Sequence, residues 1–123
     1  MYRITLKDAF HAVHSLKDSK GKCEALHKHH FKVEVDLGRE ALDSCGMVID
    51  FLEVRPALRG IVARWERASL NELPDFKGKN PSVENIARRL YEALSASLKG
   101  KEVSVECVTV WETEDAGAAY IPS

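Results

Sequence analysis

The chain has 123 residues, enough for one compact domain over residues 1–123 and too few for two domains of ordinary size. Its formal net charge of -1 argues against a nucleic-acid-binding protein, which normally carries an excess of basic residues. The sequence shows neither an apolar run of roughly 20 residues nor a secretory signal. Its 3 cysteines are irregularly spaced and are interpreted as free thiols. The protein is therefore expected to be cytoplasmic.

Two segments near the N-terminus alternate between apolar and polar residues. This period of two predicts half-buried strands of an antiparallel sheet. In the first segment, residues 2–15, His14 lies on the face that carries the apolar side chains. In the second segment, residues 27–37, His27 and His29 lie on the apolar face in the same way.

A helix is expected after these strands, because an apolar stripe recurs at helical spacing between residues 54 and 65. Its start is open. Asp50 with Glu53 could form a capping box, whereas Pro56 fits a first-turn position better. Residues 71–79 are interpreted as a polar loop that leads to a second helix.

The second helix has clearer ends. Asn80 and Pro81 are expected to be its cap and its first residue, and Gly100 is expected to end it. Residues 103–113 are rich in β-branched side chains and predict a strand, and residues 118–121 predict a short last strand. The order strand-strand-helix-helix-strand-strand predicts an α+β domain, in which a four-stranded antiparallel sheet carries two helices on one face.

The histidines on the apolar faces indicate a metal site. On one strand, His27 and His29 project to the same face about 6.6 Å apart, at a rise of about 3.3 Å per residue. Pairing of the two strands can bring His14 beside them. Three neutral imidazoles with an open fourth position are typical of a catalytic zinc site, so Zn2+ is the predicted cofactor. An isolated pair of this spacing would more often be ordinary polar residues near a strand end.

The other histidines and the cysteines have different surroundings. His30 has the opposite phase and is expected to face solvent, and His11 is also out of phase unless a bulge rotates it. Cys23 precedes His27 by four residues, in a loop expected to return towards the metal. A thiol beside a divalent cation ionises readily, which makes it a base or a nucleophile. Cys107 is interpreted as a structural residue within its strand.

Five short motifs follow one another along nearly the whole chain. They are Phe10-His11-Ala12-Val13-His14, Cys23-Glu24-Ala25-Leu26-His27-Lys28-His29, Gly46-Met47-Val48-Ile49-Asp50-Phe51, Pro81-Ser82-Val83-Glu84-Asn85 and Trp111-Glu112-Thr113. In these motifs the sequence resembles the 6-pyruvoyltetrahydropterin synthase family, including the bacterial 6-carboxy-tetrahydropterin synthases of the queuosine pathway. No single motif is decisive, but five in order at the right spacing are specific.

The resemblance implies the tunnelling fold, usually a homohexamer built from two trimers with active sites between subunits. It implies a lyase that acts on 7,8-dihydroneopterin triphosphate and gives a 6-carboxy- or 6-pyruvoyl-tetrahydropterin. It also implies that Cys23 moves protons and that Glu112, with Thr113, holds the pterin. Without the resemblance, Glu112 would be interpreted as an exposed charge at a strand end.

The sequence also departs from the family. The positions of the family's Asp-His pair are occupied here by Glu66 and Arg67. A guanidinium is always charged, so Arg67 cannot take up and return a proton as a histidine can. Glu66 and Arg67 are expected instead to form an ion pair with each other or to contact the triphosphate. Lys28 replaces the glycine between two ligands. Two alternatives therefore stay open: an aldol-type cleavage, which Glu24 favours, and a catalytically altered or weakened pterin-binding paralogue.

Overall fold

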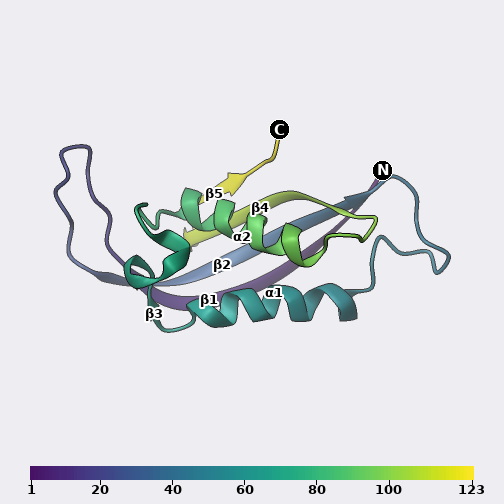
Figure 1. The fold of residues 1–123 in the computed structure, drawn as a ribbon, viewed down its shortest axis with the longest axis horizontal. Helices are drawn as coiled ribbons and strands as arrows, with labels where there is room; N and C mark the ends of the chain where they lie inside the picture. Colours follow the sequence, from purple (N-terminus) through teal and green to yellow (C-terminus); the bar gives the residue numbers. More distant parts are fainter.

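The computed structural model describes residues 1–123 as a long curved sheet with two helices packed on one face (Figure 1). Strands β1 (Tyr2–His14) and β2 (His27–Arg39) pair antiparallel along their full length, as their alternation predicts. Beyond β2 the sheet continues with β4 (Ser104–Thr113) and β5 (Ala116–Tyr120). These two strands confirm the last two strands predicted from the sequence.

Helix α1 (Phe51–Trp65) follows Asp50, whose side chain caps it by accepting a hydrogen bond from the backbone N–H of Leu52. The alternative start near Pro56 is wrong, since this proline lies inside the helix. The capping box is incomplete. The carboxylate of Glu53 pairs with Lys101 at 3.2 Å. A buried apolar stripe holds the helix against the sheet and offsets the hydrogen bond that the proline removes.

Helix α2 (Val83–Ser97) is capped by Ser82, whose hydroxyl accepts a hydrogen bond from the backbone N–H of Asn85 at 3.2 Å. The predicted cap at Asn80 is therefore wrong by two positions. The Asn80 side chain instead binds the backbone of Lys17 through both its oxygen and its nitrogen, at 2.8 and 2.9 Å. A side-chain amide can satisfy both backbone groups of an extended residue, which the local cap pattern does not reveal.

The sheet has five strands in the order β3-β1-β2-β4-β5, so the prediction of four wholly antiparallel strands is wrong by one strand. Strand β3 (Ala68–Ser69) has two residues and runs parallel to β1. Two residues are too few for a period-two pattern to be visible in the sequence. The segment expected to be a polar loop also contains two short 3-10 helices, Leu70–Glu72 and Pro74–Phe76.

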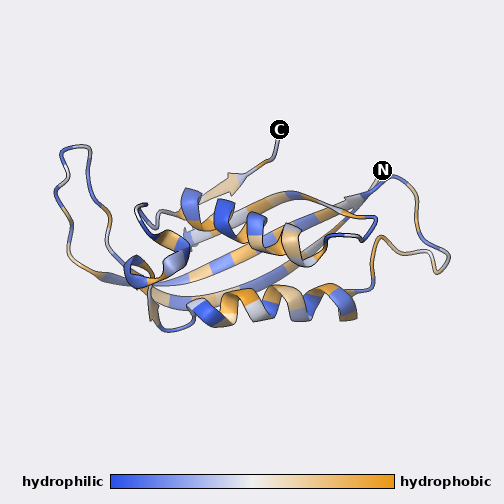
Figure 2. Ribbon diagram, viewed as in Figure 1, coloured by the Kyte–Doolittle hydropathy of each residue, from blue (hydrophilic) through white to orange (hydrophobic).

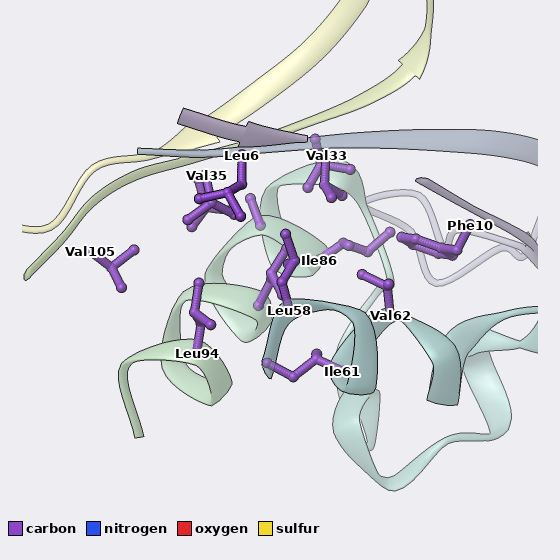
Figure 3. Close-up of a cluster of buried hydrophobic side chains, with 14 of the residues drawn as sticks. Leu6, Phe10, Val33, Val35, Leu58, Ile61, Val62, Ile86, Leu94 and Val105 are labelled. Atoms are coloured by element: carbon purple, nitrogen blue, oxygen red, sulfur yellow. The ribbon is translucent and has the colours of Figure 1, made fainter. Parts of the chain in front are cut away.

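One hydrophobic core lies between the sheet and the two helices (Figure 3). Figure 2 shows the alternation of hydrophilic and hydrophobic residues along the strands that places one face of the sheet against this core. At its centre, Phe10 of β1 stacks on Phe31 of β2 at 5.1 Å and meets Trp65 of α1 edge-on at 5.5 Å. Phe10 lies a few residues before His14, and Phe31 lies a few residues after His27. The core therefore holds the two strands in place close to the histidines. None of the helices has the length and apolar character that a bilayer-spanning helix needs.

Candidate metal centre

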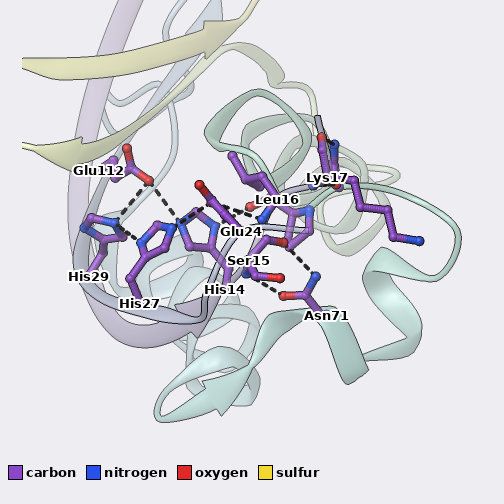
Figure 4. Close-up of polar contacts among 11 residues, drawn as sticks. His14, Ser15, Leu16, Lys17, Glu24, His27, His29, Asn71 and Glu112 are labelled. Atoms are coloured by element: carbon purple, nitrogen blue, oxygen red, sulfur yellow. Dashed lines mark hydrogen bonds and ion pairs between the residues drawn. The ribbon is translucent and has the colours of Figure 1, made fainter. Parts of the chain in front are cut away.

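The pairing of β1 with β2 brings the three predicted ligands together. His14 and His27 are directly opposite each other in the register, and His29 lies two residues further along β2. Their side chains converge with that of Glu112, and one ligand atom from each of the four residues lies within 4.8 Å of the others (Figure 4). The spacing along one strand and the pairing of two strands therefore account for the cluster.

Glu112 reaches the cluster because β4 contains a bulge. In the register with β2, Leu37 faces Val105 and Asp36 faces Cys107, so one residue of β4 is left over. The extra residue changes which face later side chains occupy, since side chains alternate along a strand. After the bulge, the face towards the helices carries Val108 and Glu112, and the Glu112 carboxylate ends beside the imidazoles.

The hydrogen bonds of His14 fix which ring nitrogen faces the cluster. Its Nδ1 lies 2.7 Å from the carbonyl oxygen of Pro81, which can only accept, so Nδ1 carries the proton. The lone pair of Nε2 then points at Oε1 of Glu112, 3.0 Å away. Two acceptors facing each other need a cation between them. His14 is fully buried, and a metal ion at this position would accept both lone pairs.

His27 and His29 complete a donor set that fits zinc. Nε2 of His27 contacts Oε1 of Glu24 at 2.8 Å, and its Nδ1 lies 2.6 Å from Nε2 of His29. Donors around a tetrahedral zinc ion lie about 3.3 Å apart, given bonds of about 2.0–2.1 Å. The contacts of 2.6 to 3.3 Å among these atoms are close to that spacing. Burial also lowers the pKa of His29 and favours the neutral imidazole that binds metals.

Hydrogen bonds also anchor the loop between β1 and β2 beside the cluster. The side chain of Asn71 binds both the N–H and the carbonyl of Ser15, at 2.9 and 2.8 Å, and Asn80 does the same for Lys17. Glu24 accepts a hydrogen bond from the backbone N–H of Leu16 at 3.0 Å. The hydrogen bond from His27 lowers the pKa of Glu24 and keeps this carboxylate ionised. The loop is thereby attached to the predicted metal ligand His27 through Glu24.

Two predicted site residues lie outside the ligand cluster. Cys23 is exposed in the same loop, and its backbone forms an isolated bridge with Lys17. Thr113 is exposed at the end of β4, where its hydroxyl donates to Asp115 at 3.0 Å. In this loop it is Glu24 whose side chain contacts a predicted metal ligand, His27. The sequence indicated Glu24 only through its position beside Cys23.

The predicted pair Glu66 and Arg67 lies at the edge of β1, beside His11. Glu66 accepts hydrogen bonds from the backbone N–H of His11 at 3.0 Å and contacts its ring at 3.1 Å. These bonds, the backbone one foremost, lower the pKa of Glu66. An open pocket of about 550 Å³ is lined here by Arg67, Lys28 and histidines of both strands. The sequence missed His11 because its partner is distant in the chain.

The fold and the donor set define a class of small α+β proteins in which histidines of two paired strands form a group that could hold a metal ion. The chain matches the 6-pyruvoyl tetrahydropterin synthase family over residues 3–123. It therefore belongs to that family. The match confirms the resemblance seen in the motifs, and it extends over both helices and all the strands described above.

Two similar proteins come from Archaeoglobus fulgidus and Pyrococcus furiosus. A protein of Archaeoglobus fulgidus, provisionally assigned as a 6-carboxy-5,6,7,8-tetrahydropterin synthase, is 34% identical over 115 residues and covers 94% of this chain and 91% of its own. The dihydroneopterin monophosphate aldolase of Pyrococcus furiosus is 32% identical, with coverage of 94% and 93%. Among solved structures, the 6-pyruvoyl tetrahydropterin synthase of Caenorhabditis elegans superposes with a TM-score of 0.84 at 25% identity, and covers 100% of this chain and 98% of that one.

Proposed function

We propose that the protein is a zinc-dependent lyase that converts 7,8-dihydroneopterin triphosphate into 6-carboxy-tetrahydropterin, for the queuosine pathway, or into 6-pyruvoyl-tetrahydropterin. The observation that carries this proposal is the convergence of three imidazoles, one of which directs its lone pair inward because Pro81 holds its other nitrogen. The relative from Archaeoglobus fulgidus supports the carboxy product. When bound, the zinc ion would supply a Lewis acid for the side-chain oxygens of the substrate.

Each of the other predicted site residues has a separate role in this proposal. Glu112 accepts hydrogen bonds from the amino and ring N–H groups of the pterin, and Thr113 lies next to it at the end of β4. Cys23 moves a proton at the substrate side chain. Arg67 lines the basic pocket, where its planar cation suits a triphosphate. Glu66 holds the strand edge on which that pocket is built.

A second candidate is an aldolase that cleaves the side chain to leave a hydroxymethyl pterin. Two observations favour it. The carboxylate of Glu24 contacts the predicted ligand His27, whereas the thiol of Cys23 is exposed and lies outside the cluster. The relative from Pyrococcus furiosus is named as an aldolase for dihydroneopterin monophosphate. A third candidate, a weakened pterin-binding paralogue, rests on the absence of an imidazole at position 67.

One experiment separates the three candidates. Zinc-loaded protein is incubated with 7,8-dihydroneopterin triphosphate and, separately, with the monophosphate, and the products are identified by mass spectrometry. A carboxy- or pyruvoyl-tetrahydropterin from the triphosphate supports the lyase, and a hydroxymethyl pterin supports the aldolase. Binding without any product supports the weakened paralogue. Protein stripped of metal by a chelator is the control, because it should yield no product.

We further propose that the chain acts as a homohexamer, a dimer of trimers, in the cytoplasm. The support lies in the surface near the start of β1 and α1, which exposes large apolar side chains, among them Tyr2, Phe51 and Leu52. Such a patch is costly for a monomer in water and is typical of an interface between subunits. Light scattering coupled to size-exclusion chromatography tests this, and a monomer at micromolar concentration would contradict it.

A further inference from the structure

Basic and imidazole side chains line an open pocket at one end of the outer face of β1 and β2. The pocket has a volume of about 550 Å³, which is within the usual range for ligand sites. Its polar lining residues are His11, Lys28, His29, His30 and Arg67. No carboxylate is among them, so the pocket suits an anionic ligand.

The two cations of this pocket have no carboxylate partner. Neither the ammonium group of Lys28 nor the guanidinium of Arg67 forms a salt bridge. The ion pair expected between Glu66 and Arg67 is absent, and the carboxylate of Glu66 instead accepts a hydrogen bond from the backbone N–H of His11 at 3.0 Å and contacts its ring Nδ1 at 3.1 Å. Like charges that share a pocket repel each other, and a bound anion removes that repulsion.

Further along the same face, a lysine has the partner that Lys28 lacks. The ammonium group of Lys7 on β1 lies 3.9 Å from the carboxylate of Glu34, which is directly opposite it on β2. The residue opposite Lys28 is Val13, which cannot pair with a charge. Cross-strand pairing therefore compensates the charge of Lys7 and leaves that of Lys28 uncompensated.

The backbone of Arg67 explains how its side chain comes to line the pocket. Arg67 has a φ of 60°, and it is the one residue other than glycine in the left-handed region. This conformation turns the chain from the end of α1 onto the edge of β1, where β3 pairs with Ala12 and Val13. The backbone N–H of Arg67 donates to the carbonyl oxygen of His11, which holds the turn in place. Non-glycine residues in this region are often found where a functional site needs an unusual backbone.

The two outer imidazoles form a fixed side of the pocket. His11 and His30 are directly opposite each other in the register, and their rings stack at 4.2 Å with an angle of 8° between the planes. The contact of Glu66 with Nδ1 of His11 fixes the stack from one side. The ring nitrogens of His30 make no hydrogen bond within the protein, so an N–H of this ring is available to an anion. Rings that are already held in place lose little conformational freedom when a ligand binds.

We propose that this outer pocket is a binding site for an oligophosphate chain, and that binding there does not need the metal ion. The guanidinium of Arg67 can bind phosphate oxygens in pairs, and the ammonium group of Lys28 acts as a point charge. Donors contributed by several residues fit a row of phosphate groups better than one small anion. The chain can be free inorganic triphosphate or the tail of dihydroneopterin triphosphate, and only the second source rests on the proposed function.

Calorimetric titration of the purified protein with inorganic triphosphate tests the site, because it needs neither pterin nor turnover. The native protein should bind about one triphosphate per chain, and the affinity should fall as salt is added. Lys28→Gln and Arg67→Gln should each weaken binding by about 10–100-fold, since each removes hydrogen bonds between charged groups. The matched control Lys7→Gln should bind as the native protein does, because Lys7 is paired with Glu34 and lies outside the pocket. All three side chains are exposed, so the fold should be retained.

Two further measurements locate the bound chain and identify its source. Protein stripped of metal should bind inorganic triphosphate with unchanged affinity, and nitrogen-15 NMR should show shifts of the His11 and His30 rings and none of His14. No binding by the native protein, equal affinity in all variants, or binding that is lost with the metal overturns the site. The same titrations with dihydroneopterin triphosphate separate the sources: a loss of affinity in Lys28→Gln supports the substrate tail, and unchanged affinity supports free triphosphate. Absence of turnover would contradict the proposed function and leave this test intact.

Discussion

Strands β1 and β2 carry histidines on both faces, and the two faces place them in opposite environments. On the face towards the helices, His14 is fully buried, and its Nδ1 contacts a backbone carbonyl oxygen. On the outer face, the side chain of His11 is 65% exposed and contacts a carboxylate. The inner imidazoles meet at their nitrogen atoms, whereas His11 and His30 lie parallel with their ring faces in contact.

The difference shows how one pair of strands can serve two kinds of chemistry. Side chains alternate between faces, so neighbouring residues such as His29 and His30 have different partners. On the inner face, burial lowers the pKa of His29, and the ring nitrogens of three imidazoles converge, which suits a metal ion. On the outer face, the carboxylate of Glu66 holds the exposed ring of His11, and the hydrogen bonds it accepts lower the pKa of Glu66. Substitutions at several residues test this difference between the two faces.

The largest expected effect is loss of the metal from the inner face. His27→Ala and His29→Ala should each reduce zinc from about one ion per chain to a small fraction and abolish turnover, because two imidazoles hold zinc far less firmly than three. Metal analysis of the purified variants by mass spectrometry measures this. His30→Ala is the matched control, since it removes an imidazole from the same strand but from the opposite face. Full zinc occupancy in the first two variants would show that the site is elsewhere.

The next effect distinguishes the two loop residues beside the inner face. If the protein is the proposed lyase, Cys23→Ala should lower kcat by about 10²–10⁴-fold and leave zinc and pterin bound. Glu24→Gln should then have a smaller effect, through the loss of its contact with His27. If the protein is the aldolase, the order of the two effects reverses. Steady-state rates of both variants measure the order, and equal activity of Cys23→Ala and the native protein would remove the thiol from the mechanism.

A smaller effect is expected from Glu112→Gln, which tests what the carboxylate binds. The variant should weaken pterin affinity by about 10–100-fold, because hydrogen bonds to a charged group contribute about 1.5–3 kcal/mol. Zinc content should stay near one per chain, since the three imidazoles remain. Calorimetric titration with a pterin measures the affinity. Glu112 Oε1 lies 3.0 Å from a ring nitrogen of His14, so loss of zinc in this variant would instead identify the carboxylate as a fourth ligand.

Much of the inner face could be predicted from the sequence. The two strands, their antiparallel pairing and the convergence of three histidines all follow from alternation along residues 2–15 and 27–37. The position of Glu112 beside the histidines could not be predicted from the sequence. Val105 and Val108 are both buried in β4, at positions of opposite parity, and only the bulge between them accounts for this. Periodicity cannot locate a bulge when both faces carry β-branched residues.

The outer face could not be predicted from the sequence, because its partners are distant in the chain. Strand phase alone places His11 on the exposed side, and nothing near it in the sequence indicates a carboxylate. Its contact with Glu66 depends on the positive φ of Arg67 and on a two-residue strand. A left-handed arginine is not apparent from residue type, since glycine and asparagine are the usual occupants of that region. Contacts across 55 residues therefore appear only in the folded chain.

The smallest predicted effect concerns the start of α2, which supports the inner face through the carbonyl of Pro81. The sequence predicts Asn80 as the cap, and the structure assigns that role to Ser82. Ser82→Ala should therefore lower the free energy of unfolding by about 1 kcal/mol, the usual cost of losing a cap, with zinc retained. Asn80→Ala should act on the loop between β1 and β2, because Asn80 holds the backbone of Lys17.

Urea unfolding and limited proteolysis separate these two changes at the start of α2. Ser82→Ala should shift the unfolding midpoint and leave cleavage of the loop unchanged, since no hydrogen bond joins its hydroxyl to that segment. Asn80→Ala should make the loop around Lys17 more susceptible to protease, because both backbone hydrogen bonds to this lysine are lost. Native stability in Ser82→Ala, together with unchanged loop cleavage in Asn80→Ala, would restore Asn80 as the cap. The position of the Pro81 carbonyl, which orients His14, would then depend on Asn80 and not on Ser82.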